Sequence, residues 1–215
     1  MIILAHGAIN KSIATAENKL FFKQWLKSPM QLGSFAPISI KLANLAAHQL
    51  TITKDTTIVE IGAGTGRLTR ALLAKGANIP KLAMVELDPI MCGFLKHSLQ
   101  QLYGSKSPLK VIEGDAGALT KIIPHSWVGK VDYVVSAIPL FNMEESDRKK
   151  IISAALDVLN PVTGSIIHVS YSPVSPIKFM EGEILQKRAV SLWGNVPPGF
   201  VWRFTQKRYL HNLSA

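Results

Sequence analysis

A carboxylate and three glycines lie close together near residue 60. Residues 58–66 read "IVEIGAGTG", so that Glu60 precedes Gly62, Gly64 and Gly66, which recur at every second position. Glycines after a strand let the backbone approach a small molecule, and the next helix offers free N–H groups at its start. The spacing departs from the G-x-G-x-x-G dinucleotide pattern. A carboxylate at position 60 would repel a diphosphate and suits a cationic amino group.

Two further acids follow at comparable positions. Glu86 comes twenty residues after Gly66, at the end of the second expected strand, where a carboxylate can accept hydrogen bonds from both hydroxyls of a ribose. Asp115 follows the third expected strand in "EGDA", where it can accept a hydrogen bond from an adenine amino group. Together with Glu60, these acids predict a site for an amino acid, a ribose and an adenine without a diphosphate between them.

The elements that would position these residues alternate from residue 56 onward. Alternation at this spacing predicts a parallel sheet covered on both faces, with the ligand at the carboxyl ends of its strands. The tail differs, because two strands separated only by "GNVPPG" form a hairpin and therefore an antiparallel edge. The expected strands are 57–61, 81–86, 109–113, 131–136, 165–171, 186–193 and 200–207, and the expected helices are 66–75, 89–102, 144–159 and about 174–185.

Residues 1–55 are expected to form a helical N-terminal extension ahead of the domain at 56–215. The segment "ENKLFFKQWLKSP" places its aromatic residues and Leu26 in one helical stripe beside a ridge of lysines, and Pro29 ends the helix. Such a helix can lie in a bilayer interface, although a stripe of this kind also docks helices onto a core. The residues expected to contact an anionic membrane surface are Lys19, Phe21, Phe22, Lys23, Trp25 and Lys27.

The glycine loop and the acids, in this order at strand ends, resemble the class I S-adenosylmethionine-dependent methyltransferases. The resemblance covers about residues 56–207, and the terminal hairpin matches the reversed last strand of that Rossmann-like fold. It implies S-adenosylmethionine as the cofactor, with S-adenosylhomocysteine as the product, and it implies no metal. The implied cofactor-binding residues are Glu60, Gly62, Ala63, Gly64, Thr65, Gly66, Glu86, Leu87, Asp115, Ala116 and Ser136.

Three local segments resemble the bacterial phospholipid N-methyltransferases of the soluble, peripheral type. These segments are "LKSPMQLGSFAPIS" at 26–39, "SAIPLFN" at 136–142 and "LWGNVPPGFVWRF" at 192–204. Against the family pattern, Ala137 replaces a glycine, Phe141 a leucine and Gly199 an alanine, and none of these changes removes a polar group. The resemblance implies methylation of phosphatidylethanolamine, and of its methylated intermediates, toward phosphatidylcholine.

The resemblance also suggests which residues meet the lipid head group. Tyr171 follows the fifth expected strand in "SYSP", where the family has a similar segment, and it would form a wall or a hydrogen bond at the head group. Asn142 and Ser136 would line the same rim. His168 lies inside that strand, where a single histidine is more often a packed core residue. Arg203 could contact the lipid phosphate, or it could be a solvated charge on an edge strand.

Two other functions are compatible with parts of the sequence. Adenine N6 dimethyltransferases of ribosomal RNA carry "N-[LI]-P-Y" after the fourth strand, and their "I-E-L-D" resembles "VELDP" here. Those enzymes hold a flipped adenine with the asparagine and stack an aromatic residue on it. In this chain Ser136 precedes Ala-Ile-Pro, and Leu140 stands at the aromatic position, so nucleic acid is not the expected partner. A nucleotide-binding module without catalysis is the third possibility.

Charge and composition indicate where the protein acts. The chain of 215 residues has 24 basic against 14 acidic residues, a net charge of +10, which favours a polyanionic partner such as an anionic membrane or nucleic acid. The single cysteine, Cys92, is expected simply to pack. The sequence shows neither a signal peptide nor an apolar run long enough to span a bilayer. We therefore expect a cytoplasmic monomer bound peripherally to the inner face of a bacterial cytoplasmic membrane.

Overall fold

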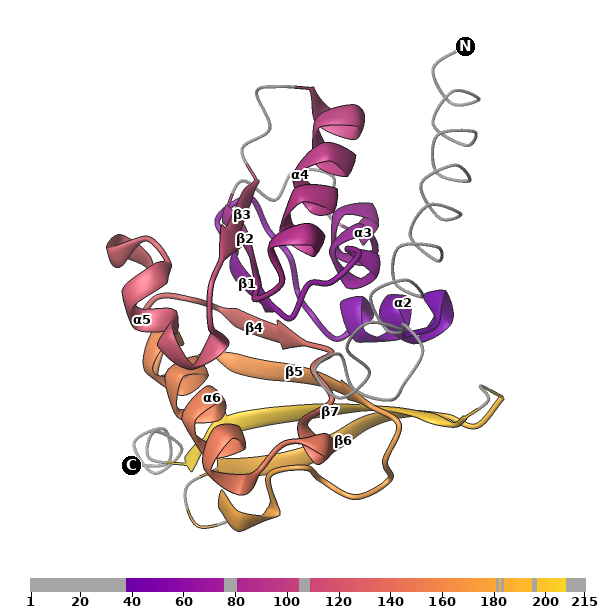
Figure 1. The fold of residues 1–215 in the computed structure, drawn as a ribbon. Helices are drawn as coiled ribbons and strands as arrows, with labels where there is room; N and C mark the ends of the chain where they lie inside the picture. Colours follow the sequence, from indigo (N-terminus) through magenta and orange to yellow (C-terminus); the bar gives the residue numbers. More distant parts are fainter. Residues whose placement is uncertain are drawn as a thin grey trace.

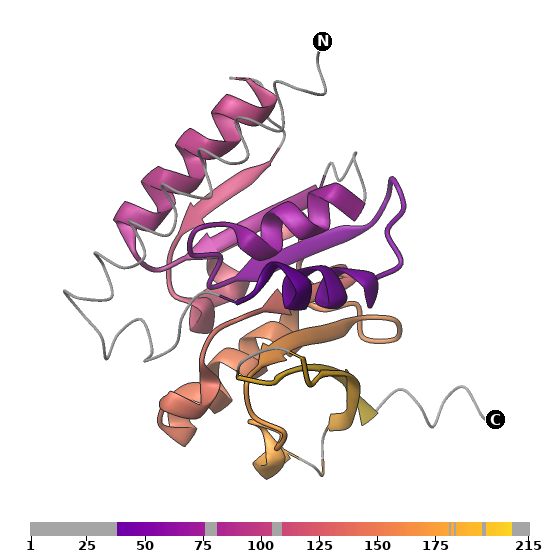
Figure 2. The same ribbon diagram turned by 90° about the vertical axis from the view of Figure 1, so that its right-hand side faces the viewer.

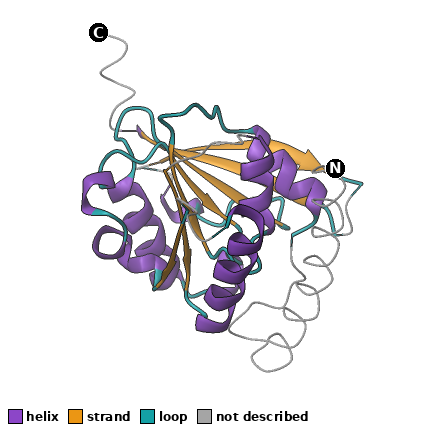
Figure 3. Ribbon diagram, turned by 90° about the horizontal axis from the view of Figure 1, so that it is seen from above, coloured by secondary structure: helices purple, strands orange, loops and turns teal. Residues whose placement is uncertain are grey.

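A twisted seven-stranded sheet forms the centre of the protein. The computed structural model describes residues 38–75, 81–104, 109–180, 182, 184–194 and 197–207. Within these ranges the strand order is β3-β2-β1-β4-β5-β7-β6, and helices cover both faces of the sheet (Figures 1 and 3). The predicted α/β fold class, with seven strands and an antiparallel C-terminal hairpin, is confirmed.

The order of the strands reverses between β1 and β4, which are neighbours in the sheet but not in the sequence. The first five strands are parallel, and β7 runs antiparallel to both β5 and β6. The reversal creates a crevice at the carboxyl ends of β1 and β4, where ligands bind in open α/β sheets. The strands are β1 (Thr57–Ile61), β2 (Lys81–Glu86), β3 (Lys110–Glu113), β4 (Tyr133–Ser136), β5 (Ser165–Ser170), β6 (Ile184–Leu192) and β7 (Gly199–Gln206).

The helices divide between the two faces of the sheet. Residues of α2, α3 and α4 join one buried cluster, whereas residues of α5 and α6 join the other. The helices are α2 (Ile40–His48), α3 (Arg67–Lys75), α4 (Pro89–Tyr103), α5 (Leu119–Ile122) and α6 (Glu145–Val158), and the 3-10 turns are η1 (Ala116–Ala118), η2 (His125–Trp127), η3 (Leu140–Asn142) and η4 (Lys178–Met180).

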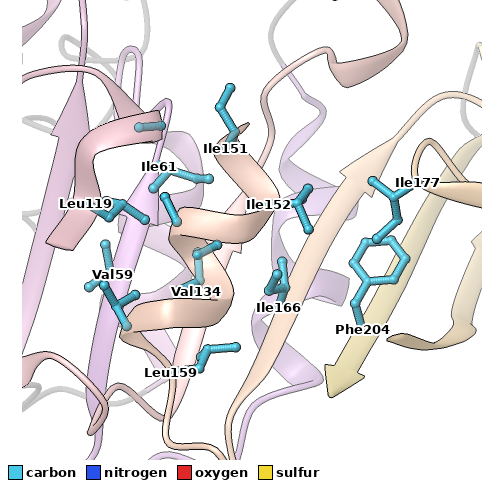
Figure 4. Packing of buried hydrophobic residues seen from close by; sticks show 14 of the residues in the cluster. Val59, Ile61, Leu119, Val134, Ile151, Ile152, Leu159, Ile166, Ile177 and Phe204 are labelled. Carbon is cyan, nitrogen blue, oxygen red and sulfur yellow. The ribbon is translucent and has the colours of Figure 1, made fainter. Parts of the chain in front are cut away.

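The apolar runs in the strands are buried because both faces of the sheet are covered. All five residues of β1 are buried, and in β5 only the last residue is partly accessible. Figure 4 shows how alternate residues of the strands, such as Val59, Val134 and Ile166, point toward α6, where Ile152 meets them. Cys92 is buried on α4, and its thiol donates to the carbonyl of Glu86 at 3.4 Å.

The helix α2 belongs to the core, although it lies in the predicted extension. The hydroxyl of Ser39 caps it by accepting from the N–H of Leu42, and the side chain of Leu42 is fully buried. A Cβ atom at Gly199 would lie 2.5 Å from Leu42, so α2 packs closely on the start of β7. Figure 2 shows α2 between α3 and the hairpin. The aromatic and lysine residues predicted at 19–27 lie outside the described residues.

Two expectations about the C-terminal half are wrong. Instead of a helix at about 174–185, the chain forms the short turn η4 and then enters β6 at Ile184. Pro176 weighs against a helix here, because proline disfavours helical geometry in the residue before it and lacks an N–H. The strand β7 is not an edge strand either, since it lies between β5 and β6.

The described residues contain no helix that is both long and apolar enough to cross a bilayer.

Truncation of Leu42 tests whether α2 is part of the folded core. We expect Leu42→Ala to lower the free energy of unfolding by about 2–5 kcal/mol, because it leaves a cavity beneath β7. Exposed Lys41 is the neighbouring control, and Lys41→Ala should change the value by less than about 0.5 kcal/mol. Urea unfolding followed by circular dichroism measures both, and a loss below about 1 kcal/mol for Leu42→Ala would contradict this role.

Candidate functional site

The loop after β1 requires its glycines for two different reasons. Gly62, Gly64 and Gly66 have φ angles of 67°, 54° and 82°, which residues with a side chain rarely adopt. A Cβ atom would lie 2.4 Å from Ile138 at Gly62 and 2.7 Å from Leu95 at Gly66, so packing excludes it there. At Gly64 no atom lies within 4 Å of that position, which leaves the backbone open to a ligand.

A cavity of about 280 Å³ opens against this loop at the carboxyl ends of β1, β4 and β5. Its walls come from the glycine loop, the start of α3, the segment after β4, the end of β5 and one residue of the β6–β7 turn. The lining residues are Ile38, Glu60, Gly62, Ala63, Gly64, Thr65, Arg67, Leu68, Ala137, Ile138, Pro139, Leu140, Phe141, Asn142, His168, Val169, Ser170, Tyr171, Ser172 and Pro197.

Glu60 is the buried acid of this cavity. Its side chain is 1% exposed, and its Oε2 accepts a hydrogen bond from the hydroxyl of Thr69 at 2.6 Å. Burial raises the pKa of Glu60 from its ordinary value to about 8, although the hydrogen bond from Thr69 and the charge of Arg70 oppose the rise. The carboxyl group is therefore protonated near neutral pH until a cation lies beside it.

Glu86 and Asp115 lie at the predicted strand ends but outside the cavity lining. Glu86 accepts from the N–H groups of Gly64 at 2.7 Å, Leu87 at 2.9 Å and Asp88 at 3.0 Å, so it fastens the glycine loop to β2. Asp115 accepts from the N–H of Gly117 at 2.8 Å and from the ammonium of Lys150 at 2.6 Å. Both carboxylates keep further lone pairs that can accept hydrogen bonds from a ligand.

The hydrogen bond from Lys150, together with that from Gly117, holds the pKa of Asp115 below its ordinary value. Asp115 is therefore an anion at neutral pH, in contrast to Glu60. Of the other predicted cofactor residues, Ala63 and Thr65 line the cavity, whereas Gly66 and Ala116 are buried outside its lining and Leu87 is exposed.

The structure separates the residues that were predicted to meet the substrate. Asn142 and Tyr171 line the cavity together. Ser136 does not, which corrects the predicted rim: it is buried, and its Oγ accepts from the N–H of Ile138 at 3.2 Å. His168 is buried as expected of a core residue, yet it also lines the cavity.

The guanidinium of Arg203 lies toward the amino end of β5. It donates to the Oγ of Ser165, the first residue of β5, and to the backbone carbonyl of Gln49. The cavity forms at the other end of β5, so Arg203 holds α2 against the sheet and cannot contact a ligand in the cavity. Neither of the two roles considered for it from the sequence is correct.

Two lining residues, Ile38 and Ile138, stood out in the sequence only as parts of longer motifs. Ile38 lies far from the glycine loop in the chain, and the guanidinium of Arg67 holds it there by donating to its carbonyl at 2.9 Å. Ile138, which faces Gly62, was noticed only as part of a motif. Among the described residues there is no cluster of three histidine, cysteine or acidic side chains that could hold a metal ion.

Comparison with known proteins gives two groups of relatives. Residues 31–121 match the family described as ribosomal RNA adenine dimethylase. An ornithine lipid N-methyltransferase of Singulisphaera acidiphila is 24% identical over 154 residues, which cover 72% of this chain and 78% of that protein. A probable ribosomal RNA small subunit methyltransferase A of Haloquadratum walsbyi is 32% identical over 106 residues, 49% of this chain and 34% of that protein.

Solved structures support the assignment of the fold. The structure of TrmK of M. capricolum, in complex with S-adenosyl-homocysteine, has a TM-score of 0.61 at 12% identity and covers 80% of this chain and 70% of that one. At such low identity, the likeness concerns the fold. The fold is that of the class I S-adenosylmethionine-dependent methyltransferases. The chain spans about a third of the ribosomal RNA enzyme but most of the lipid enzyme.

Proposed function

We propose that this chain, an S-adenosylmethionine-dependent methyltransferase, methylates the amine of a lipid head group at a membrane surface. The proposed substrate is phosphatidylethanolamine, with its methylated intermediates, on the way to phosphatidylcholine. The proposal includes peripheral binding of the protein to the inner face of a bacterial cytoplasmic membrane.

The cofactor is S-adenosylmethionine, and the residues of the cavity fit it. When bound, it supplies a methyl group on a positively charged sulfur. Glu60 is a buried carboxyl group that a cationic amino group would convert into an ion pair. Gly64 leaves open space beside the backbone, and Glu86 and Asp115 lie at the next two strand ends as acceptors for hydroxyl and amino groups.

The distribution of exposed apolar side chains carries the proposal of a lipid substrate. Five of the nine large apolar residues that are exposed in the described part follow the carboxyl end of a strand or adjoin the cavity lining. An apolar surface of this kind marks a contact with a membrane or another macromolecule. The five are Ile40, Leu87, Ile90, Phe141 and Trp193, whereas Tyr103, Val162 and Leu185 lie toward the opposite end of the strands, and Val174 shares a second pocket with Leu185.

Trp193 is the most prominent of these residues near the substrate end of the cavity. Its side chain is 69% exposed, and its ring packs edge-on against Phe200 at 5.7 Å. Phe200 pairs with Ser170, which lines the cavity, so the indole projects beside the opening. An indole in this position suits the interface between lipid head groups and acyl chains.

A second lipid, ornithine lipid, is the other candidate substrate. The relative that acts on it aligns with most of both chains, whereas the ribosomal RNA enzyme aligns with less than half of this one. Both lipids present an amine near a bilayer surface, so the same methyl transfer to an amine could act on either lipid. The assay below distinguishes them.

Methylation of RNA adenine is less compatible with the segment after β4. Ala137 stands directly before Ile138 and Pro139, and it has no side chain that could hydrogen-bond a base. Leu140, at the position expected for a stacking aromatic residue, is 1% exposed and packed in the core. The match to the ribosomal RNA dimethylase family ends at residue 121, before this segment begins.

Proton release tests the role of Glu60 toward the cofactor. At pH 6.5 Glu60 is protonated in the free protein because its pKa is about 8, and the ammonium of S-adenosylhomocysteine should ionise it. Calorimetric titrations in buffers of different ionisation enthalpy should therefore show release of about one proton per ligand bound.

The matched variants are Glu60→Gln and Glu113→Gln, the second at an exposed acid that ends β3. Glu60→Gln should bind more weakly and release no proton, while Glu113→Gln should behave as the wild type does. Equal proton release by Glu60→Gln and the wild type would show that another group meets the ammonium.

The substrate class is tested by methyl transfer from labelled S-adenosylmethionine. Purified full-length protein would be given vesicles with phosphatidylethanolamine, vesicles with ornithine lipid, and ribosomal RNA, each in a separate reaction. We expect label in the lipid phase, with phosphatidylethanolamine as the accepted head group. Label in ornithine lipid alone would mean that ornithine lipid, and not phosphatidylethanolamine, is the lipid substrate. Label in RNA alone would refute the proposal.

Removal of exposed apolar groups tests contact with the membrane. The double variant Ile40→Ser, Trp193→Ser should bind vesicles containing anionic lipid about tenfold more weakly, since it loses apolar area that enters the interface. Its binding of S-adenosylhomocysteine should stay unchanged, because neither residue lines the cavity.

The control is Tyr103→Ser, Val162→Ser, which removes exposed apolar groups from the opposite edge. Sedimentation with sucrose-loaded vesicles measures all three proteins. A similar loss of vesicle binding in both double variants, or a loss in neither, would contradict the idea that the side where the cavity opens faces the membrane.

A further inference from the structure

A buried histidine forms part of the cavity wall. His168 is the fourth residue of β5, its side chain is 1% exposed, and it lines the cavity. In the sheet it pairs with Ser136 of β4 and with Trp202 of β7. Its ring stacks on Phe204 with centroids 6.4 Å apart, so packing fixes the position of the imidazole.

One nitrogen of this imidazole has no partner. Among the described residues, Nδ1 of His168 makes no hydrogen bond to protein, and neither does Nε1 of the neighbouring Trp202. These two atoms lie on directly paired residues but do not bond to one another. Buried polar atoms rarely stay unpaired in native proteins, and because His168 lines the cavity, a ligand bound there is the available partner for its ring.

The chemistry of the ring restricts what that partner can be. Burial lowers the pKa of His168 to about 3, so the imidazole is neutral and one of its nitrogens keeps a free lone pair. Glu60 is the other titratable group that faces this cavity from the neighbouring parallel strands, and its side chain lies on the opposite face of the sheet, against Thr69 of α3. A neutral acceptor suits an N–H donor.

The position of His168 assigns this donor to the substrate. The acids that fit the cofactor lie on β1 and at the ends of β2 and β3, on one side of the strand reversal. His168 lies on β5, beyond β4 on the other side, and two strand spacings amount to about 10 Å. Asn142 and Tyr171 lie on the same side, so this half of the cavity is available to the second reactant.

Resting on the proposed function, we infer that His168 accepts a hydrogen bond from the amine nitrogen of the lipid head group. The bond orients the nitrogen, so that its own lone pair points away from β5 and toward the cofactor half of the cavity. His168 is thus a substrate-contacting residue, and not only a core residue.

This role has a consequence for successive methylations. A free primary amine carries two N–H groups, a monomethylated amine carries one, and a dimethylated amine carries none. The hydrogen bond to His168 is therefore available in the first two methyl transfers and absent in the third. A histidine that only supported the fold would affect all three transfers alike.

The test compares three lipids in otherwise identical vesicles: phosphatidylethanolamine and its N-methyl and N,N-dimethyl derivatives. His168→Phe keeps a ring against Phe204 and removes the acceptor, whereas His168→Asn returns an acceptor near the position of Nδ1. We expect His168→Phe to lower the initial rates on the first two lipids at least tenfold relative to the third. His168→Asn should restore much of the loss, and both variants should bind S-adenosylhomocysteine as the wild type does.

An equal fall on all three lipids, or no fall, would overturn the role of His168 while leaving the lipid substrate in place. A wild type that methylates none of these lipids would instead refute phosphatidylethanolamine as the substrate, and the inference with it.

A second measurement does not depend on turnover. In the complex with S-adenosylhomocysteine, glycerophosphoethanolamine should shift the ring ¹⁵N resonances of His168, and glycerophosphocholine, which has no N–H, should not. Equal responses to the two head groups, or none to either, would overturn the proposed contact.

Discussion

The burial of one carboxyl group at the reversal of the sheet is the constraint on which the site depends. The side chain of Glu60 is buried beneath the glycine loop, where the hydroxyl of Thr69 donates to it at 2.6 Å. Ionisation of such a buried carboxyl group is costly and becomes favourable only beside a cation. The tight loop above it requires glycines, because its φ angles are positive and because a Cβ atom at Gly62 would collide with Ile138. Glu86 holds that loop in place by accepting a hydrogen bond from the N–H of Gly64.

The same reversal divides the cavity between two reactants. The strands β1, β2 and β3 supply acids in the order that an amino acid, a ribose and an adenine require, while β4 and β5 supply a neutral wall. Because methyl transfer mainly requires two reactants to be held in line, the protein contributes by positioning rather than by a strong base. The exposed apolar residues on this side of the molecule, among them Phe141 and Trp193, match an amine that is presented at a bilayer surface.

Local patterns in the sequence were sufficient to predict most of the fold. Continuous apolar runs located the buried parallel strands to within about two residues, and the short "GNVPPG" connection predicted the antiparallel hairpin. The expectation of a helix at about 174–185 failed because Pro176 lies within it. The position of β7 between β5 and β6 could not be predicted, since sequence order does not show which strand of a hairpin joins the sheet.

The site was predictable only where its residues follow strand ends. Glu60, Glu86 and Asp115 lie where their spacing places them, but the partners that now hold them, such as Lys150, come from distant elements. Ser136 differs from expectation because its Oγ accepts from the nearby N–H of Ile138, and Arg203 differs because its hydrogen bonds depend on tertiary contacts. His168 shows the same limit: its burial followed from an apolar strand, whereas its access to the cavity depends on where the sheet ends.

The central claim is that the cavity receives its amine from a membrane surface. The most direct measurement compares kcat/KM for one head group in two forms: phosphatidylethanolamine in vesicles that contain anionic lipid, and glycerophosphoethanolamine in solution. The account predicts a preference for the vesicle form of at least a hundredfold, most of which is lost when high salt and the serine variant at Ile40 and Trp193 are combined. Equal values for the two forms would contradict it, and would mean that the apolar side of the cavity serves another purpose.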